Sequence, residues 1–263
     1  MEPMLDVRVE GEAGSIPALA FLDVLRTSLD LLDQLERAES LNSKPAGGWL
    51  IADLRSSSAV ATLRRPDAAN LQSHLRLVQG VGSLRQSEEL PPYFSPDIAE
   101  GLVKIGRQLR QPGISGVTFV VPGLDGAAPV SEPVTEAVVT NAKTSVEGTD
   151  RAVGSVAGIL DVINLRRGNH IISLYDEESR RAVRCKFPDE MFEVMKDALG
   201  HRIRALGVVT RNKRGQVLRV DIERVEALPD EAGAPSVDEL AGIAPWFTGD
   251  QSTEDYLRSV RGA

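Results

Sequence analysis

An ordered run of strand-like segments with one short helix among them, between residues 153 and 228, most restricts how this chain can fold. The strands cover residues 153–163, 170–176, 182–187, 202–210 and 217–228, and the helix is expected at residues 189–199. The first strand contains Gly154 and Gly158, which a strongly coiled strand can use at a bend. Five strands with a helix between the third and the fourth predict a small barrel.

This stretch, residues 151–229, resembles the OB-like five-stranded barrel domains of uncharacterised bacterial proteins. The residues that carry the resemblance are 154–160, 182–187 and 205–209. The resemblance covers under a third of the chain, and it implies a fold but no reaction, because one fold can serve many functions. It also draws attention to the second and third strands, since OB folds bind oligonucleotides through that region.

The chain before the barrel mixes helical and strand patterns. Strands are expected at residues 5–10, 49–54, 59–63, 116–121 and 133–140, and helices at residues 17–40, 66–84 and 96–109. In the first helix, leucines recur at spacings of three and four and form one apolar face: Leu22, Leu25, Leu29, Leu32 and Leu35. Ser95, before Pro96, is expected to cap the third helix. This mixture is typical of the α+β class.

We therefore expect an α+β protein in three parts. An α+β domain covers residues 1–148, an OB-like five-stranded β-barrel covers residues 149–229, and a linker with a short helical C-terminal tail covers residues 230–263. The net charge of the chain is -8, but basic residues outnumber acidic ones in the barrel segment, whereas both flanking segments are acidic. Such a separation of charge affects association with partners more than it affects the fold.

The C-terminal tail is too apolar for a purely disordered segment, and it follows a linker-like stretch at residues 230–235. Near its end stand Glu254, Tyr256, Leu257, Arg258 and Arg261. These residues resemble the toxin-binding tails of bacterial antitoxins, in which a short helix docks on a ribonuclease toxin and an arginine approaches its acidic, metal-binding site. The physical basis is a guanidinium that binds carboxylates.

We add the apolar Trp246 and Phe247 to these expected partner-binding residues. One departure from the antitoxin pattern is that the usual small DNA-binding N-terminal domain is missing, and an α+β domain stands in its place. The alternative for the tail is that it folds back on its own chain and covers a barrel edge or the first domain.

Basic residues on the second and third barrel strands, or in the turn between them, offer an alternative function. Arg180, Arg181, Arg184 and Lys186 could form a track for the phosphates of single-stranded nucleic acid. Single-strand binders usually add aromatic side chains on this face, and the barrel has few of them. The acidic charge of the whole chain also weighs against this function.

Residues suited to catalysis do not form a recognisable group in the sequence. Cys185 alternates with Val183 and Phe187, so its thiol is expected inside the barrel rather than at a reactive site. The three histidines, His74, His170 and His201, lack the spacing of a zinc site. We therefore expect no enzyme activity, no catalytic residues, no cofactor and no bound metal.

The expected function is that of a non-enzymatic protein-interaction module. In its specific form it is antitoxin-like and neutralises a protein partner, a toxin or nuclease, through the C-terminal tail; the alternative is single-stranded nucleic-acid binding by the barrel. A single cysteine is typical of a reducing compartment. The N-terminus has no apolar run that would serve as a signal peptide or a membrane span, so the expected location is cytoplasmic, with no membrane partner.

Overall fold

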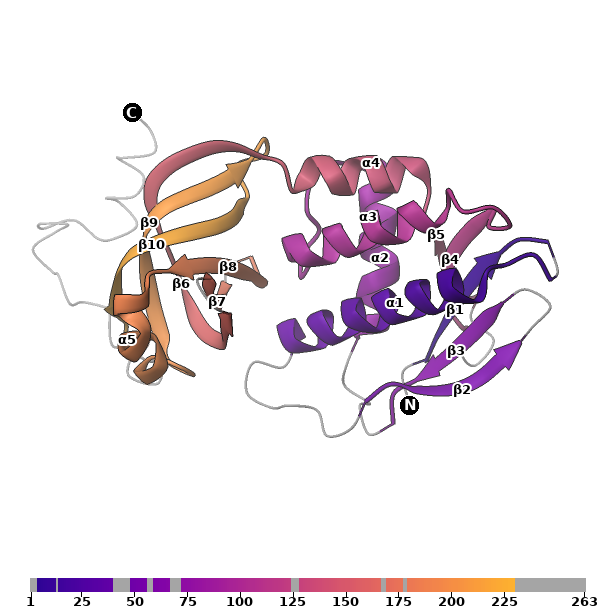
Figure 1. Ribbon diagram of the computed structural model, residues 1–263, viewed down its shortest axis with the longest axis horizontal. Helices are drawn as coiled ribbons and strands as arrows, with labels where there is room; N and C mark the ends of the chain where they lie inside the picture. Colours follow the sequence, from indigo (N-terminus) through magenta and orange to yellow (C-terminus); the bar gives the residue numbers. More distant parts are fainter. Residues whose placement is uncertain are drawn as a thin grey trace, which may run out of the picture. The chain divides into compact units, whose positions relative to one another are not determined.

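The computed structural model describes residues 4–12, 14–39, 48–55, 59–66, 72–123, 128–166, 169–176 and 179–229. Its first elements are β1 (Met4–Glu10), α1 (Ala18–Glu39), β2 (Leu50–Arg55), β3 (Val60–Arg64), α2 (Ser73–Gln86), α3 (Pro96–Gln108), β4 (Gly116–Val121), β5 (Val130–Pro133) and α4 (Glu136–Ser145). These strands form an antiparallel sheet in the order β2-β3-β1-β4-β5. Helices α1 to α4 are grouped together next to this sheet (Figure 1).

The core of this N-terminal part lies between the sheet and the helices. Alternation along β1 places Leu5, Val7 and Val9 on the buried side. The apolar face of α1 is confirmed at most of its positions, because Leu25, Leu32 and Leu35 are buried; Leu22 is the exception, with 55% of its surface exposed. The cap of α3 is confirmed as well, since the side chain of Ser95 accepts a hydrogen bond from the backbone N–H of Ile98.

The strand expected at residues 133–140 is wrong, because only Pro133 belongs to β5, and residues 136–140 begin α4. Thr135 caps this helix by accepting a hydrogen bond from the backbone N–H of Val138. Val138 and Ala142 of α4 are buried and lie about one helical turn apart, on the same face of the helix. Burial of this stripe outweighs the strand propensity of the valines in the segment.

The second group of strands closes into a barrel in the order β10-β8-β7-β6-β9. It contains β6 (Gly148–Arg166), β7 (Asn169–Asp176), β8 (Arg181–Phe187), β9 (Arg202–Asn212) and β10 (Val217–Ala227). A short 3-10 turn (Asp189–Met191) and α5 (Phe192–Asp197) lie between β8 and β9. Neighbouring strands are antiparallel except β10 and β8, which are parallel. The predicted strands, and the helix between the third and the fourth, are therefore confirmed.

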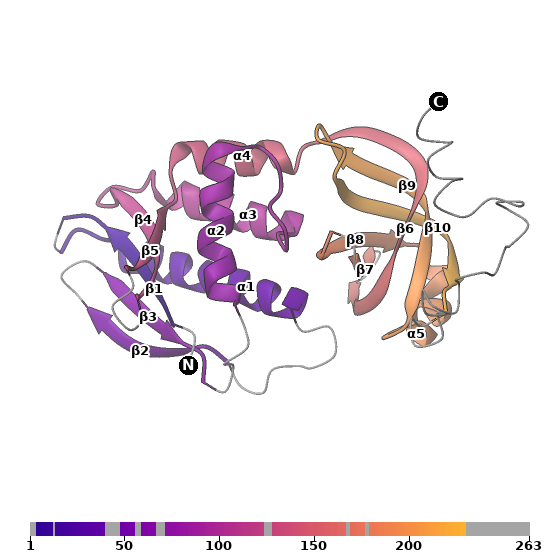
Figure 2. The ribbon, with the colours of Figure 1, turned by 180° about the vertical axis from the view of Figure 1, so that it is seen from behind.

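The long strand β6 belongs to both sides of the barrel, because it changes partner along its length (Figure 2). Its first part pairs with β9 and its last part pairs with β7, and Ile159 is opposite a residue of each. Gly158 stands immediately before this change. A Cβ atom at Gly158 would lie 2.0 Å from the backbone carbonyl oxygen of Tyr175, so the close approach requires glycine. This is the bend that the glycines in the sequence predict.

The chain divides into two compact units, Met1–Ala227 and Leu228–Ala263. The first unit contains both the N-terminal part and the barrel, while the second lies almost entirely outside the described residues. The division into three domains that the sequence suggests stays a prediction. Within the described residues, no helix is long and apolar enough to span a membrane.

Candidate binding cleft

The basic residues expected to bind nucleic acid lie at β8, and three of them contact the N-terminal part of the chain. Arg180 Nη1 donates a hydrogen bond to Tyr93 Oη at 2.6 Å. Arg181 donates to two backbone carbonyl oxygens, that of Leu90 at 2.8 Å and that of Pro91 at 3.3 Å. Arg184 forms an ion pair with Asp97 at the start of α3. The sequence places these arginines correctly on one region, and the fold uses that region for contacts within the chain.

Lys186, the fourth of these residues, is exposed on β8. No ion pair links it to another residue in the described part of the chain. A single lysine supplies little of the phosphate attraction that four basic residues would supply together.

A second set of contacts joins the barrel to the N-terminal part at the turn between β9 and β10. Gln216 Oε1 accepts a hydrogen bond from the backbone N–H of Leu90 at 2.9 Å, and its Nε2 donates to the carbonyl oxygen of Leu90 at 3.1 Å. Asn212 Nδ2 donates to the carbonyl oxygen of Ser145 at 2.8 Å. The segment around Leu90 is therefore held both by β8 and by this turn.

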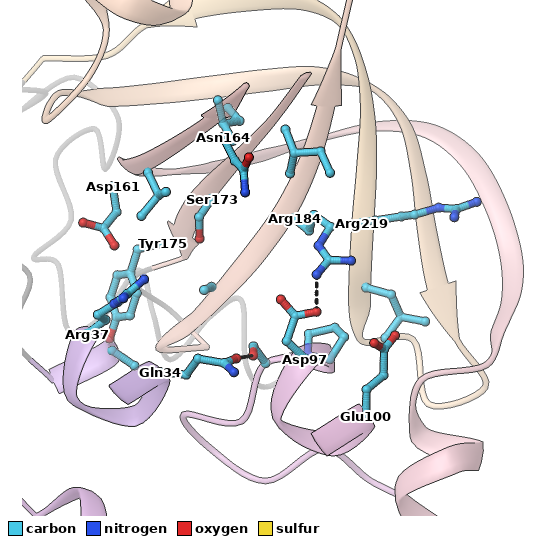
Figure 3. Close-up of a pocket in the computed structure, with 18 of the residues that line it drawn as sticks. Gln34, Arg37, Asp97, Glu100, Asp161, Asn164, Ser173, Tyr175, Arg184 and Arg219 are labelled. Carbon is cyan, nitrogen blue, oxygen red and sulfur yellow. Dashed lines mark hydrogen bonds and ion pairs between the residues drawn. The ribbon is translucent and has the colours of Figure 1, made fainter. Parts of the chain in front are cut away.

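A cleft of about 860 Å³ lies between these contacts and the face of the barrel. Residues of α1 and α3 form one wall, and residues of β6, β7 and β8 form the other, as Figure 3 shows. The ion pair between Arg184 and Asp97 crosses from one wall to the other. The volume is within the range of pockets that bind ligands, about 300–1,000 Å³. The cleft thus lies against β6, β7 and β8 of the barrel.

Charge in the cleft is dominated by carboxylates. The acidic residues of the lining are Asp30, Asp33, Asp97, Glu100 and Asp161, and the basic ones are Arg37, Arg184 and Arg219. Two of these arginines are already neutralised, Arg37 by Asp33 at 3.2 Å and Arg184 by Asp97. The third, Arg219, extends away from the other labelled residues (Figure 3).

Asp30, Glu100 and Asp161 form no ion pair with another residue in the ranges that the structure describes. All three residues are exposed, and no partner within the described residues cancels their charge, so they attract cations and repel anions. The electrostatics of the cleft therefore favour a positively charged ligand and disfavour a polyanion.

Apolar and neutral polar groups complete the lining. Ile171 of β7 and Val162 of β6 provide partly exposed apolar surface, while Asn164 and Ser173 provide hydrogen-bonding groups. Burial raises the pKa of Tyr175, so its hydroxyl stays protonated at neutral pH and is able to donate a hydrogen bond. Apolar surface with a few charged and polar groups is typical of ligand-binding sites.

The single thiol lies in the barrel core, as the alternation of β8 predicts. Cys185 is fully buried beside other core residues, and burial raises the pKa of its thiol to about 12. A reactive thiolate needs an exposed and electropositive setting, which this position does not supply.

The three histidines have separate surroundings. Burial lowers the pKa of His74 in α2 to about 4. His170 Nδ1 lies 3.0 Å from Asp189 Oδ1, and its ring is 5.4 Å from that of Phe187, measured between centroids. His201 is exposed. In the described part of the chain, no group of three or more His, Cys, Asp and Glu residues could hold a metal ion.

The expected partner-binding residues of the tail, Trp246, Phe247, Glu254, Tyr256, Leu257, Arg258 and Arg261, lie outside the described residues. The acidic residues of the cleft were not predicted from the sequence. Asp97 was expected in a helix and Asp161 in a strand, but a local pattern carries no information on which helix meets which strand. The one indication in the sequence is that Asp97 and Asp161 belong to a predicted helix and a predicted strand rather than to loops.

No protein-family model matches the chain, and no curated protein matches it. Among solved structures, it is similar to "OBody AM1L10 bound to hen egg-white lysozyme", with 19% identity over 33% of this chain and 85% of that chain, and a TM-score of 0.26. It is also similar to a chain of the S. pombe Stn1-Ten1 complex, with 22% identity over 33% of this chain and 62% of that chain, and a TM-score of 0.23. Similarity at this level carries no argument about function.

Proposed function

We propose that this chain is a non-enzymatic protein-interaction module that binds a cationic segment of a partner protein in the cleft. The observation that carries the proposal is the charge of the lining: three carboxylates, Asp30, Glu100 and Asp161, face the cleft without an ion pair among the described residues, whereas two of the three arginines are already paired. An arginine or lysine side chain would neutralise these carboxylates. The apolar groups beside them would bind the neighbouring residues of the same segment.

The contacts of the barrel arginines support a protein ligand over the nucleic-acid alternative. Arg180, Arg181 and Arg184 bind Tyr93, Leu90, Pro91 and Asp97, so these guanidiniums are occupied where a phosphate track would need them free. A strand of nucleic acid in the cleft would also meet the excess of carboxylates, which repels phosphates.

The antitoxin-like form of the function adds a second contact through the C-terminal tail. Its support is the resemblance of residues 254–261 to toxin-binding tails, with Arg258 and Arg261 expected to meet carboxylates of a toxin or nuclease. The cleft and the tail would then bind separate surfaces of one partner in the cytoplasm, where the single thiol stays reduced.

Fluorescence anisotropy with defined probes tests the proposal. The probes are a labelled peptide of leucine, serine and two arginines, the same peptide with glutamates in place of the arginines, and a short single-stranded oligonucleotide. We expect the full chain to bind the arginine peptide more tightly than both others. The paired substitutions Glu100→Gln and Asp161→Asn should weaken this binding about fivefold to thirtyfold, because each exposed ion pair contributes about 0.5–1 kcal/mol.

A matched control separates a site from an effect of net charge. Glu193→Gln with Asp197→Asn on α5 removes the same charge from residues that do not line the cleft, and it should leave binding unchanged. Equal binding of the arginine and glutamate peptides, or no binding, would exclude the proposal. Tight oligonucleotide binding that falls steeply with salt and with Lys186→Ala would support the nucleic-acid alternative in its place.

A further inference from the structure

The ion pair between Arg184 and Asp97 places a guanidinium of this chain on a carboxylate of the cleft (Figure 3). Arg184 belongs to β8 in the barrel wall, and Asp97 belongs to the first turn of α3 in the opposite wall. The contact has the same chemistry as the one proposed above between an arginine of a bound segment and a carboxylate of the lining. Arg184 therefore occupies a position that an arginine of the ligand could also take.

The barrel holds Arg184 on the side of the cleft. Its neighbours along β8, Val183 and Cys185, belong to the barrel core, so alternation places Arg184 on the outer face of the strand. Arg184 lies opposite Arg219 of β10, and like charges at opposite positions of paired strands repel each other. Arg219 extends away from the other labelled residues, whereas Arg184 is directed toward Asp97 (Figure 3). The strand pairing thus favours the contact across the cleft.

The helix fixes the position of Asp97 relative to the other carboxylates. Ser95 caps α3, which sets Asp97 in the first turn of the helix. Glu100 follows three residues later, so the Cβ atoms of the two acidic residues lie about 5–6 Å apart, and both residues line the cleft. A segment whose first positive side chain reaches Glu100 has Asp97 within reach of a second one. That second contact requires Arg184 to leave.

Solvent reaches both members of this ion pair. The side chain of Arg184 is 50% exposed and that of Asp97 is 40% exposed. An ion pair of this kind changes an equilibrium only about twofold to fivefold, and water solvates the guanidinium once it is released. The buried pair of Glu36 and Arg65, in which both side chains are 3% exposed, could not open in this way. The contact across the cleft is therefore weak enough for a ligand to displace it.

We propose that Arg184 is an internal competitor for the cleft, which covers Asp97 until an arginine of the bound segment displaces it. Asp97 then becomes a fourth carboxylate of the binding site. This inference rests on the proposed function, because it concerns the binding of a cationic segment in the same cleft. The competition lowers the affinity for every cationic segment. It favours segments with an arginine, whose planar guanidinium can bind a carboxylate through two hydrogen bonds.

Fluorescence anisotropy with the arginine peptide tests this inference through the direction of the change. Arg184→Gln frees Asp97 and should tighten binding about twofold to fivefold. If the ion pair only held the two walls together, the same substitution would weaken binding. Arg219→Gln is the matched control, because it removes an equal charge from the lining but breaks no ion pair within the described residues. It should tighten binding by less than about twofold, since solvent and salt screen its charge.

Two further measurements identify Asp97 as the carboxylate for which both guanidiniums compete. In a chain that carries Asp97→Asn, the addition of Arg184→Gln should tighten binding no more than the addition of Arg219→Gln. Binding by the Arg184→Gln variant should fall more steeply with salt than binding by the wild-type chain, because the variant gains one more ion pair overall when the peptide binds. Circular dichroism would verify that all variants fold.

The outcomes separate this inference from the proposed function. If the wild-type chain binds the arginine peptide and Arg184→Gln has the same effect as Arg219→Gln, or weakens binding, the competition is excluded and the proposed function stands. If neither the wild-type chain nor the Arg184→Gln variant binds the peptide, both are excluded. Binding that appears only in the Arg184→Gln variant would support the inference in its strongest form.

Discussion

Replacing Arg65 by methionine should lower the free energy of unfolding by about 3–5 kcal/mol, because it leaves a buried carboxylate without its partner. Arg65 Nη2 lies 3.1 Å from Glu36 Oε2, and both side chains are only 3% exposed. Trp49 Nε1 donates a second hydrogen bond to Glu36 Oε1 at 2.6 Å. One indole hydrogen bond cannot compensate for a full charge held away from water.

The pH dependence of this effect follows from the protonation of Glu36. Burial already raises the pKa of Glu36 in the folded wild-type protein, and loss of Arg65 would raise it further. A carboxyl group whose pKa is higher in the folded state than in the unfolded state stabilises the fold at low pH, and this contribution is lost as the pH rises. The deficit of the Arg65→Met variant should therefore be smaller near pH 4.5 than at pH 8.

Urea unfolding followed by circular dichroism measures the loss in the free energy of unfolding, and two further variants serve as controls. Arg37→Met breaks an ion pair with Asp33 in which both side chains are about 60% exposed, and it should cost less than about 0.5 kcal/mol. Combining Glu36→Leu with Arg65→Met removes both charges and should restore most of the lost stability. Equal costs for Arg65→Met and Arg37→Met would contradict this account of the core.

Replacing Gly158 by alanine should destabilise the barrel by about 3–4 kcal/mol. The added Cβ would lie 2.0 Å from the carbonyl oxygen of Tyr175, and both groups belong to paired strands that cannot separate without breaking the ladder. The position matters because β6 changes partner at Ile159, so a displacement there would affect the pairing with both β9 and β7. The same displacement would move Tyr175 in the wall of the cleft.

Gly154→Ala is the control within the same strand. Its Cβ would lie 3.3 Å from the nearest atom, a methyl carbon of Val209, which a small shift relieves. We expect a cost of about 1 kcal/mol or less, measured by thermal unfolding of both variants. If the two alanine variants were equally stable, the close approach at Gly158 would not be what requires a glycine there.

The barrel could be predicted from the sequence because each strand carries its own alternation, and because the order of strands and helix limits the topology. Cys185 was placed correctly by the same alternation. The segment 133–140 was placed incorrectly, because its valines favour a strand. The burial of Val134, Val138 and Ala142 is visible only in the folded structure. In such short segments, packing determines the structure more strongly than the local propensity for a strand.

The cleft could not be predicted from the sequence, because it exists only where α1 and α3 meet the barrel. The sequence identifies Arg180, Arg181 and Arg184 as a group of basic residues, but it does not show which residues bind them. Tyr93, Leu90 and Asp97, which bind them, are about ninety residues away along the chain. Contacts at such a separation leave no periodic signal in one sequence.

Hydrogen exchange of the full chain, with and without the arginine peptide, tests most directly whether the cleft is the binding site. We expect backbone amides of residues 93–100, 159–164 and 171–175 to exchange more slowly with the arginine peptide and to be unaffected by the glutamate peptide. These segments belong to the two walls of the cleft, to which α1 also contributes residues. Slower exchange confined to β9 and β10, or no change in any segment, would contradict the assignment of this cleft as a site for a cationic protein segment.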